Sequence, residues 1–112
     1  MKTIFQKIYD GEVPSKQVYK DDLCMAICDL NPQAPVHILL IPKKPIPRLS
    51  EASGEDAEIL SHLLLTAPKV AKAAGLEDGF RVVINNGLMA GETVPHLHLH
   101  ILGGRQMAWP PG

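Results

Sequence analysis

Three of the five histidines in this chain stand two residues apart, in a stretch where polar and apolar residues alternate. The stretch reads Val94-Pro95-His96-Leu97-His98-Leu99-His100-Ile101-Leu102-Gly103-Gly104. Alternation with a period of two is typical of a β-strand, so we expect the three imidazoles to project from one face and the intervening Leu97, Leu99 and Ile101 to enter the core. Leu or Val would serve a purely structural face at lower cost, because each buried imidazole needs hydrogen-bond partners. The row of three histidines therefore indicates a catalytic or ligand-binding role rather than a purely structural one.

Zinc binding is the first chemistry to consider, since imidazole is a common zinc ligand. Neighbouring histidines of the row lie about 7 Å apart at Cα, so a pair can converge on one ion. His96 and His100 lie about 13 Å apart, too far for all three side chains to meet at one metal with Zn–N bonds of about 2.1 Å. A pair joined by His37 remains an alternative. Cys24 and Cys28 lack the spacing of a structural zinc pair and lie beyond disulfide reach on one strand, so we interpret them as core residues.

Nucleophilic catalysis at phosphorus suits the row better. A neutral imidazole attacks phosphorus near pH 7, and the resulting P–N bond is labile to water. A second imidazole can hold a phosphoryl oxygen or move a proton, and a third can fix the tautomer of its neighbour. Asn85, Thr93 and loop amides can donate hydrogen bonds to the phosphate. We therefore expect no required cofactor, although zinc remains an alternative ligand.

Two polar residues in otherwise apolar strands each allow two interpretations. Asp29 ends an apolar stripe and could cap an Asx-type turn, or accept two hydrogen bonds from a vicinal diol such as a ribose. His37 is the only polar residue of the segment 35–42, where it could bind backbone groups or join the row of histidines. The residues by themselves leave these alternatives open.

Composition restricts the class of partner. The 112 residues suit a single domain, 1–112, and 46% of them are hydrophobic, as is ordinary for a globular protein. The formal net charge of −1 gives no broad field that would attract a nucleic acid or an anionic membrane. No segment is long and apolar enough to span a bilayer, and the N-terminus lacks an apolar signal region, so we expect a cytoplasmic protein.

The remaining patterns predict the elements that position the histidines. We expect a short helix over residues 4–8, strands over 18–19, 23–29, 35–42 and 80–85, and a histidine-bearing strand over 94–104. Apolar residues at helical spacing predict one amphipathic helix that starts at the capping-box pair Ser53 and Asp56 and ends at Gly75. Pro68 should kink this helix or break it in two. These elements predict an α+β fold on an antiparallel sheet of about five strands.

The spacing His96-Leu97-His98-Leu99-His100-Ile101-Leu102 resembles the motif of the histidine triad superfamily. The resemblance extends to Asp29-Leu30-Asn31-Pro32-Gln33-Ala34-Pro35-Val36-His37 and to the ending Gly103-Gly104-Arg105-Gln106-Met107-Ala108-Trp109-Pro110-Pro111-Gly112. That ending is similar to the branch of histidine triad nucleotide-binding proteins. The resemblance implies a hydrolase that cleaves the P–N bond of purine nucleoside phosphoramidates through a nucleotidyl-histidine and releases the nucleoside monophosphate.

The resemblance also implies a role for individual residues. His98 would be the nucleophile, His100 would bind a phosphate oxygen, His96 would orient His98, His37 matches a fourth histidine, and Thr93 falls near the leaving group. Asp29 matches a ribose-binding carboxylate. The purine pocket and the phosphate-facing segments would comprise Ile4, Phe5, Ile8, Val13, Ile27, Leu30, Asn85, Gly91 and Glu92, besides Thr93, His98 and His100.

Relatives of this branch are homodimers whose C-terminal tails reach the partner's active site, which would bury Trp109. The chain differs from some relatives at three positions. Ile27 replaces an aromatic residue, which concerns stacking on the base, and Pro45 and Ala108 replace histidines, which concerns leaving-group selectivity. Two other functions stay open: hydrolysis of dinucleoside polyphosphates, and a nucleotide-binding regulatory or scaffold role with incidental hydrolysis.

Overall fold

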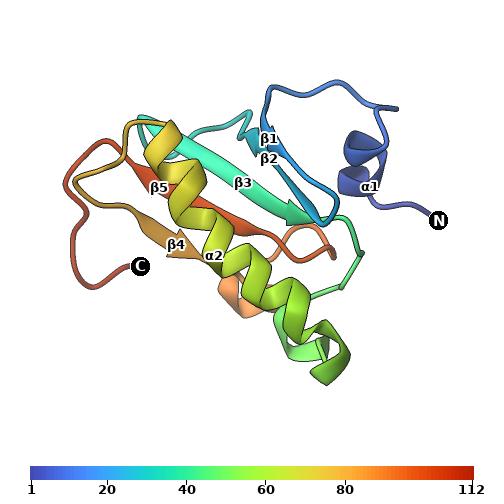
Figure 1. Cartoon of the computed structure of the whole chain (residues 1–112). Coiled ribbons are helices and arrows are strands. Elements are labelled where there is room, and N and C mark those ends of the chain that lie inside the picture. The colour runs from blue at the N-terminus through green and yellow to red at the C-terminus, as the bar shows by residue number, and fades with distance from the viewer.

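The computed structural model describes residues 1–112 and contains a single five-stranded antiparallel sheet (Figure 1). The strand order is β1-β2-β3-β5-β4, so the two strands that carry His37 and His100 lie side by side. The strands are β1 (Gln17–Lys20), β2 (Cys24–Cys28), β3 (Val36–Pro42), β4 (Arg81–Val83) and β5 (Leu99–Gly103), and the α-helices are α1 (Ile4–Tyr9) and α2 (Ala57–Ala73). Three 3-10 turns span Leu49–Glu51, Gly54–Asp56 and Leu88–Ala90. The predicted α+β class with an antiparallel sheet and two unequal helices is confirmed.

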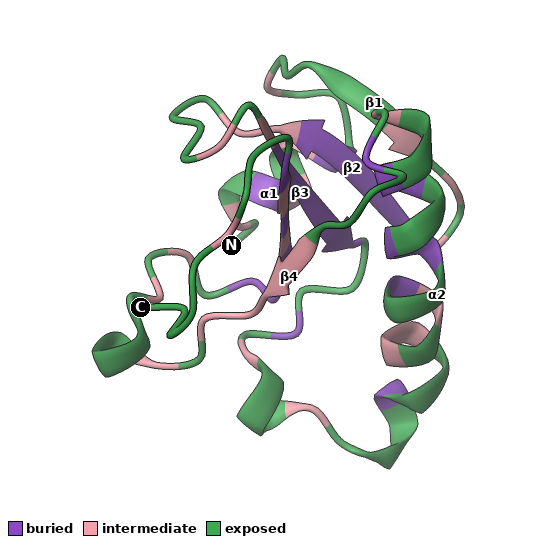
Figure 2. Ribbon diagram, turned by 90° about the vertical axis from the view of Figure 1, so that its left-hand side faces the viewer, coloured by how far each residue is buried: buried purple, intermediate pink, exposed green.

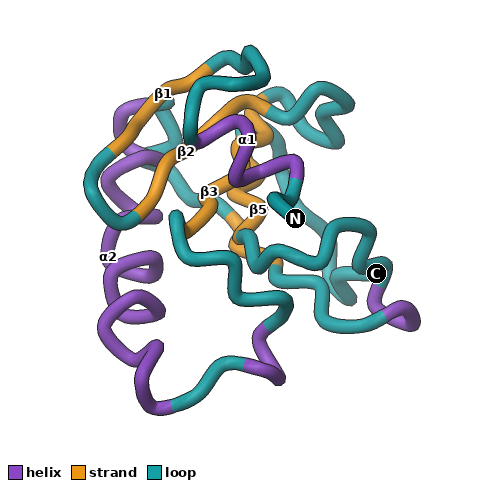
Figure 3. Tube along the Cα trace, turned by 90° about the vertical axis from the view of Figure 1, so that its right-hand side faces the viewer, coloured by secondary structure: helices purple, strands orange, loops and turns teal.

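The two helices lie on opposite faces of the sheet (Figure 3), and an apolar cluster lies under each of them. Side chains that alternate along each strand divide between them: Cys24 and Ala26 face α2, whereas Met25 and Ile27 face α1. Leu97, Leu99 and Ile101 pack on the α2 side, as the alternation predicted. Burial is greatest in the central strands β2 and β3, while the edge strands β1 and β4 are more exposed (Figure 2).

The predicted capping box opens the 3-10 turn Gly54–Asp56, and α2 follows directly from Ala57. Ser53 accepts a hydrogen bond from the Glu55 amide, and the Asp56 side chain accepts one from the Ser53 amide at 3.0 Å. The helix continues through Pro68 for 17 residues, which excludes a break into two helices. Pro68 and Leu64 both lie on the exposed side, so water can solvate the Leu64 carbonyl that has lost its amide partner. Neither helix is long and apolar enough to cross a membrane.

The histidine-bearing strand is shorter than predicted. It begins at Leu99, so His96 and His98 precede it. The ladder with β3 ends at the pair Leu40 and Leu99, and the Leu97 amide instead donates to the Ile46 carbonyl at 2.7 Å. The strand expectation over 94–98 is therefore wrong, because Ile46 follows a proline-rich turn and supplies only an isolated partner. The alternation of faces nevertheless persists through this segment.

The two cysteines differ in environment. Cys24 is fully buried in the cluster under α2, as expected of a core residue, and this burial, together with Asp21, raises the pKa of its thiol to about 12. Cys28 ends β2 and is half-buried. Both are free thiols.

Candidate functional site

Four histidines gather on the sheet face that α1 covers in part. His37 comes from β3, His100 from β5, and His96 and His98 from the segment that leads into β5. His37, His96 and His98 are buried, with 7%, 1% and 9% of their surface exposed. The ring of His100 lies 5.0 Å from that of His98 and 5.1 Å from that of His37, measured between centroids. The structure thus brings together the four histidines that the sequence singled out.

His96 is held at both ring nitrogens. Its Nε2 lies 2.7 Å from the Pro42 carbonyl oxygen, which can only accept, so this nitrogen carries the hydrogen. Its Nδ1 lies 2.6 Å from the hydroxyl of Thr3, which therefore donates to it. Burial lowers the pKa of His96, which favours this neutral form. Thr3 thus ties the N-terminal segment to the histidine row.

The tautomer of His98 follows from one backbone contact. Its Nδ1 lies 2.7 Å from the carbonyl oxygen of His96, so Nδ1 carries the hydrogen. In the neutral ring the lone pair is then on Nε2. The Phe5 and His98 rings pack in a T-shaped arrangement at a centroid distance of 5.0 Å, which limits rotation of the imidazole.

His37 and His100 form a chain of hydrogen bonds whose direction is set by the backbone. The Gln33 amide donates to Nδ1 of His37 at 3.0 Å, so Nε2 of His37 carries the hydrogen. That hydrogen faces Nδ1 of His100 at 2.9 Å and Oδ2 of Asp29 at 3.4 Å. Since Nδ1 of His100 accepts, its Nε2 carries a hydrogen and serves as a donor.

The donor nitrogen of His100 lies 3.5 Å from Nδ2 of Asn85, which is also a donor, so the two nitrogens are in contact without a hydrogen bond and the His100 N–H is left for a ligand. Burial, followed by repulsion from His98 and His37, lowers the pKa of His100 to about 4. The ring is therefore neutral at pH 7, and it presents an N–H group rather than a positive charge. Such a group can donate to an anionic oxygen next to the lone pair of His98.

Asp29 forms the Asx-type turn that the sequence allowed, and its second oxygen is still able to accept hydrogen bonds from a ribose. Its Oδ1 accepts a hydrogen bond from the Asn31 amide at 2.8 Å, which is an Asx-type turn. Its Oδ2 faces His37, and a fifth of the side chain is exposed. The ligand atoms of Asp29, His37 and His100 lie within 4.8 Å of one another, so these three could also hold a metal ion.

The predicted apolar pocket residues divide into two groups. Phe5 and Ile27 are buried in the cluster on the α1 face, and Ile8 packs against it. Val13 is half-buried, whereas Ile4 is 44% and Leu30 is 99% exposed. The structure therefore brings together Phe5, Ile8 and Ile27 and leaves Ile4 and Leu30 at the surface.

The loop between β4 and β5 is shaped by Glu92. Its carboxylate accepts hydrogen bonds from Arg48 at 3.0 to 3.2 Å and from the Gly87 amide at 2.9 Å. The hydrogen bond from Arg48, followed by that from the Gly87 amide, lowers the pKa of Glu92. Gly87 and Gly91 adopt positive φ values of 90° and 85°, which glycine accommodates without strain. Thr93, in the same loop, is exposed.

Sequence reasoning did not find Thr3, Gln33 or Arg48. The Thr3 and Gln6 side chains form a capping box at the start of α1, and the T-x-x-Q spacing carries that signal. No local pattern connects Thr3 with His96, which lies 93 residues away. The roles of Gln33 and Arg48 likewise depend on contacts made across the fold.

A model of the HIT domain family matches residues 10–107, nearly the whole chain. The chain belongs to the HIT domain family. Among HIT relatives, an uncharacterized HIT-like protein of Synechocystis is 63% identical over 110 residues, which cover 98% of this chain and 96% of that protein. A 14 kDa zinc-binding protein of Zea mays is 54% identical over 98% of this chain and 88% of its own length.

Solved HIT structures share the fold closely. A HIT family hydrolase from Legionella pneumophila superposes with a TM-score of 0.96 at 46% identity, covering 99% of this chain and all of that one. The histidine triad nucleotide-binding protein of Candida albicans has a TM-score of 0.83 at 30% identity, covering 97% of this chain and 83% of that one. The family match and these neighbours agree on the fold, and they include both a hydrolase and a nucleotide-binding protein.

Proposed function

We propose that this HIT domain protein is a hydrolase of purine nucleoside phosphoramidates, in the branch of histidine triad nucleotide-binding proteins. One observation carries the proposal. The hydrogen bond from Nδ1 of His98 to the His96 carbonyl leaves the lone pair on Nε2, the state that a nucleophile toward phosphorus requires. The relatives called HIT family hydrolase and histidine triad nucleotide-binding protein support this reaction class and this ligand.

The reaction proceeds in two displacements. Nε2 of His98 attacks the α-phosphorus, the bond to the leaving nitrogen breaks, and the amine departs after taking a proton from solvent, which the attacking water returns in the second step. Water then attacks the nucleotidyl-histidine, and the nucleoside monophosphate leaves with His98 regenerated. The N–H group of His100 donates to a non-bridging phosphoryl oxygen in both steps, where negative charge accumulates.

The surrounding residues supply the rest of the substrate site. Asp29 accepts hydrogen bonds from the ribose hydroxyls, and Phe5, Ile8 and Ile27 contact the purine. We assign Asn85, Gly91 and Thr93 to the segments that face the phosphate and the leaving group. We propose that Glu92 holds the shape of this loop and does not contact the substrate, because its carboxylate already accepts hydrogen bonds from Arg48 and the Gly87 amide.

The proposed chemistry uses groups of the protein and a water molecule. One relative is called a zinc-binding protein, and in this chain Asp29, His37 and His100 could coordinate such an ion. Coordination there would use Nδ1 of His100 and disturb the donor chain from His37. We therefore propose that turnover persists after chelation, and that zinc at this place would lower it.

We also propose a homodimer. Strand β4 forms an open sheet edge, Leu64 and Leu65 are 59% and 70% exposed on α2, and Trp109 is 83% exposed in the protomer. Exposed apolar groups of this size are often covered by a partner. A second copy of the chain would bury the tail residue Trp109.

The decisive experiment is quenched turnover of an AMP–amine conjugate followed by mass spectrometry. We expect AMP attached to His98, and we expect the His98→Asn substitution to abolish the adduct and lower kcat at least about a thousandfold while AMP still binds. Full activity of this variant would contradict the proposal. Faster turnover of dinucleoside polyphosphates would favour the alternative substrate, and tight AMP binding with negligible turnover would favour a regulatory role.

A further inference from the structure

A second cluster of chemically reactive side chains lies on the other face of the sheet. Asp21 and Cys24 flank the β1–β2 turn, and His62 projects from α2 toward them. The donor atoms of these three side chains lie within 4.8 Å of one another. Cys24 belongs to the core under α2, so the sheet separates this cluster from the histidine row. None of the three takes part in the reaction proposed above.

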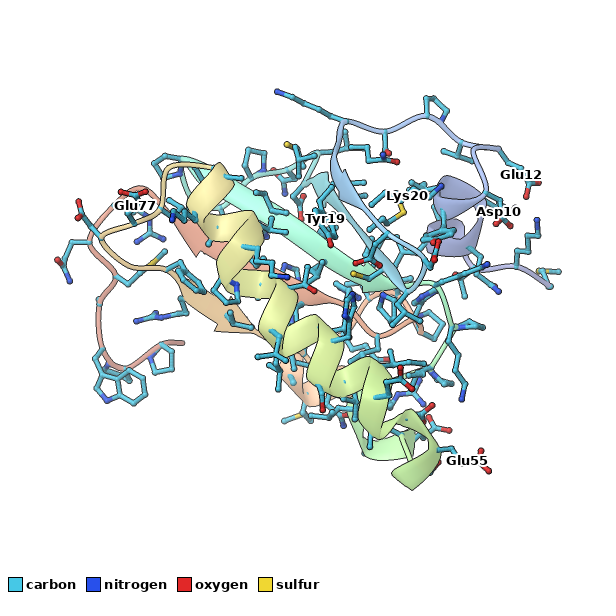
Figure 4. All side chains as sticks on the ribbon, viewed as in Figure 1. Asp10, Glu12, Tyr19, Lys20, Glu55 and Glu77 are labelled. Carbon is cyan, nitrogen blue, oxygen red and sulfur yellow. The ribbon has the colours of Figure 1, made fainter.

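Asp21 organises the cluster through its two oxygens. Oδ1 accepts hydrogen bonds from the Leu23 and Cys24 amides, both at 2.8 Å, which fixes the orientation of the carboxylate. Oδ2 therefore faces the other two side chains. It lies 2.7 Å from Nε2 of His62 and 3.8 Å from Sγ of Cys24. Tyr19 on β1 (Figure 4) donates its hydroxyl to the same oxygen at 2.7 Å.

The three side chains of the cluster differ in their exposure to solvent. Cys24 is fully buried, whereas the side chains of Asp21 and His62 are 25% and 32% exposed. An ion can therefore enter from the solvent side and keep a water molecule there, while the sulfur lies behind it. Bond lengths of about 2.0 to 2.3 Å at tetrahedral angles separate ligand atoms by about 3.3 to 3.7 Å, so displacements of about 1 Å complete the site.

We propose that Asp21, Cys24 and His62 bind one Zn²⁺ ion, with water as the fourth ligand. A thiolate, an imidazole and a carboxylate together offer sulfur, nitrogen and oxygen ligands, which suit zinc. This ligand set disfavours Mg²⁺ and Ca²⁺, because these ions prefer oxygen ligands only. Binding releases the thiol proton, and the hydrogen on Nε2 of His62 moves to Nδ1. The ion links the β1–β2 turn to α2, and it acts as a structural staple away from the nucleotide site.

Cobalt titration of the metal-free protein tests this site, because Co²⁺ reports its own ligands. We expect one equivalent of Co²⁺ to give an intense visible spectrum typical of a tetrahedral ion and a near-ultraviolet thiolate-to-metal band. The Cys24→Ser variant should lose the near-ultraviolet band, and His62→Gln should weaken Co²⁺ binding at least about tenfold. Zinc should raise the Tm of the wild-type protein and should not raise that of His62→Gln.

Two control variants separate the site from the rest of the chain. Cys28→Ser and His37→Gln should both retain the full spectrum, because neither residue belongs to the cluster. The proposal is overturned if the wild-type protein gives no thiolate band, or if the band survives in His62→Gln at wild-type affinity. It is also overturned if His37→Gln abolishes binding. His62 is half-exposed, so its variant decides the question even where Cys24→Ser fails to fold.

Discussion

The hydrogens on the histidines are placed by fixed partners rather than by the histidines themselves. Carbonyl oxygens of Pro42 and His96 hold hydrogens on His96 and His98, and the Gln33 amide determines the tautomer of His37. His96 is bound at both ring nitrogens, whereas His98 keeps the lone pair on Nε2, and His100 the hydrogen on Nε2, for the substrate. Chemically identical side chains thus acquire different capacities, acceptor at His98 and donor at His100.

Thr3 is the residue through which this arrangement can be tested. Thr3→Val should lower the free energy of unfolding by about 1 to 3 kcal/mol, because it removes the cap of α1 and leaves Nδ1 of buried His96 without a donor. Thr3→Ser keeps the hydroxyl and should behave nearly as the wild type. Urea unfolding of the three proteins measures the difference. Loss of stability in Thr3→Ser but not in Thr3→Val would show that the methyl group, not the hydroxyl, stabilises the contact.

At the scale of elements, the two helices have unlike roles. Helix α1 is short and places Phe5 against His98, whereas α2 covers the opposite face and supplies His62. The loop between β4 and β5 is tied to the segment after β3 by the pair Arg48 and Glu92. Catalytic candidates therefore come from strands and loops, and the long helix mainly stabilises the sheet beneath them.

Helix α2 also carries an identifiable weakness at Pro68. The Pro68→Ala substitution should raise the free energy of unfolding by about 1 to 3 kcal/mol, because it restores an amide donor for the Leu64 carbonyl and a better helix former at an exposed position. Circular dichroism during urea unfolding measures the gain. Lys69→Ala, at the next exposed position, should change stability much less. A Pro68→Ala protein less stable than the wild type would indicate that the proline has a packing role.

At the scale of the molecule, burial of histidines makes folding sensitive to acid. The folded pKa of His100 is about 4 and that of His96 is lowered too, whereas histidine in the unfolded chain titrates near 6.5. Between those values the unfolded chain binds more protons than the folded one, so stability is full above about pH 6.5 and falls as the pH is lowered toward 4.

We expect His100→Asn to flatten this part of the profile. Chemical denaturation at intervals from pH 7 to pH 4.5 measures it, in a range where most of the unfolded-state carboxylates have not yet titrated. His62→Gln serves as a comparison outside the row. An unchanged slope in His100→Asn would show that other groups bind the protons.

The tail provides a second prediction at this scale. Trp109 is the only tryptophan, so its fluorescence reports the C-terminus alone. If a second copy buries the exposed ring, emission should shift to shorter wavelength as concentration rises, in parallel with dimer formation in analytical ultracentrifugation. The Trp109→Ala variant should weaken the dimer. A monomer with solvent-exposed emission at micromolar concentration would contradict the proposed assembly.

Local patterns in the chain sufficed for the fold class, the capping box before α2, the facing of Leu97, Leu99 and Ile101, and the row of three histidines. His37 joined that row only through the resemblance to the histidine triad superfamily. These features depend on periodicity and on side-chain type, which act between near neighbours. The same reasoning overestimated the histidine strand by six residues, five of them before Leu99, because the ladder with β3 ends at the pair Leu40 and Leu99 and such pairing cannot be seen from one segment.

Only the tertiary structure decided which histidine carries which hydrogen. The partners that determine it come from distant places: Thr3 and Pro42 for His96, and the turn at Gln33 for His37. It also showed that Glu92 binds Arg48, and that Asp21, Cys24 and His62 converge. A hydrogen bond or a metal site is specified to within about an ångström, and such precision arises when separate elements pack together.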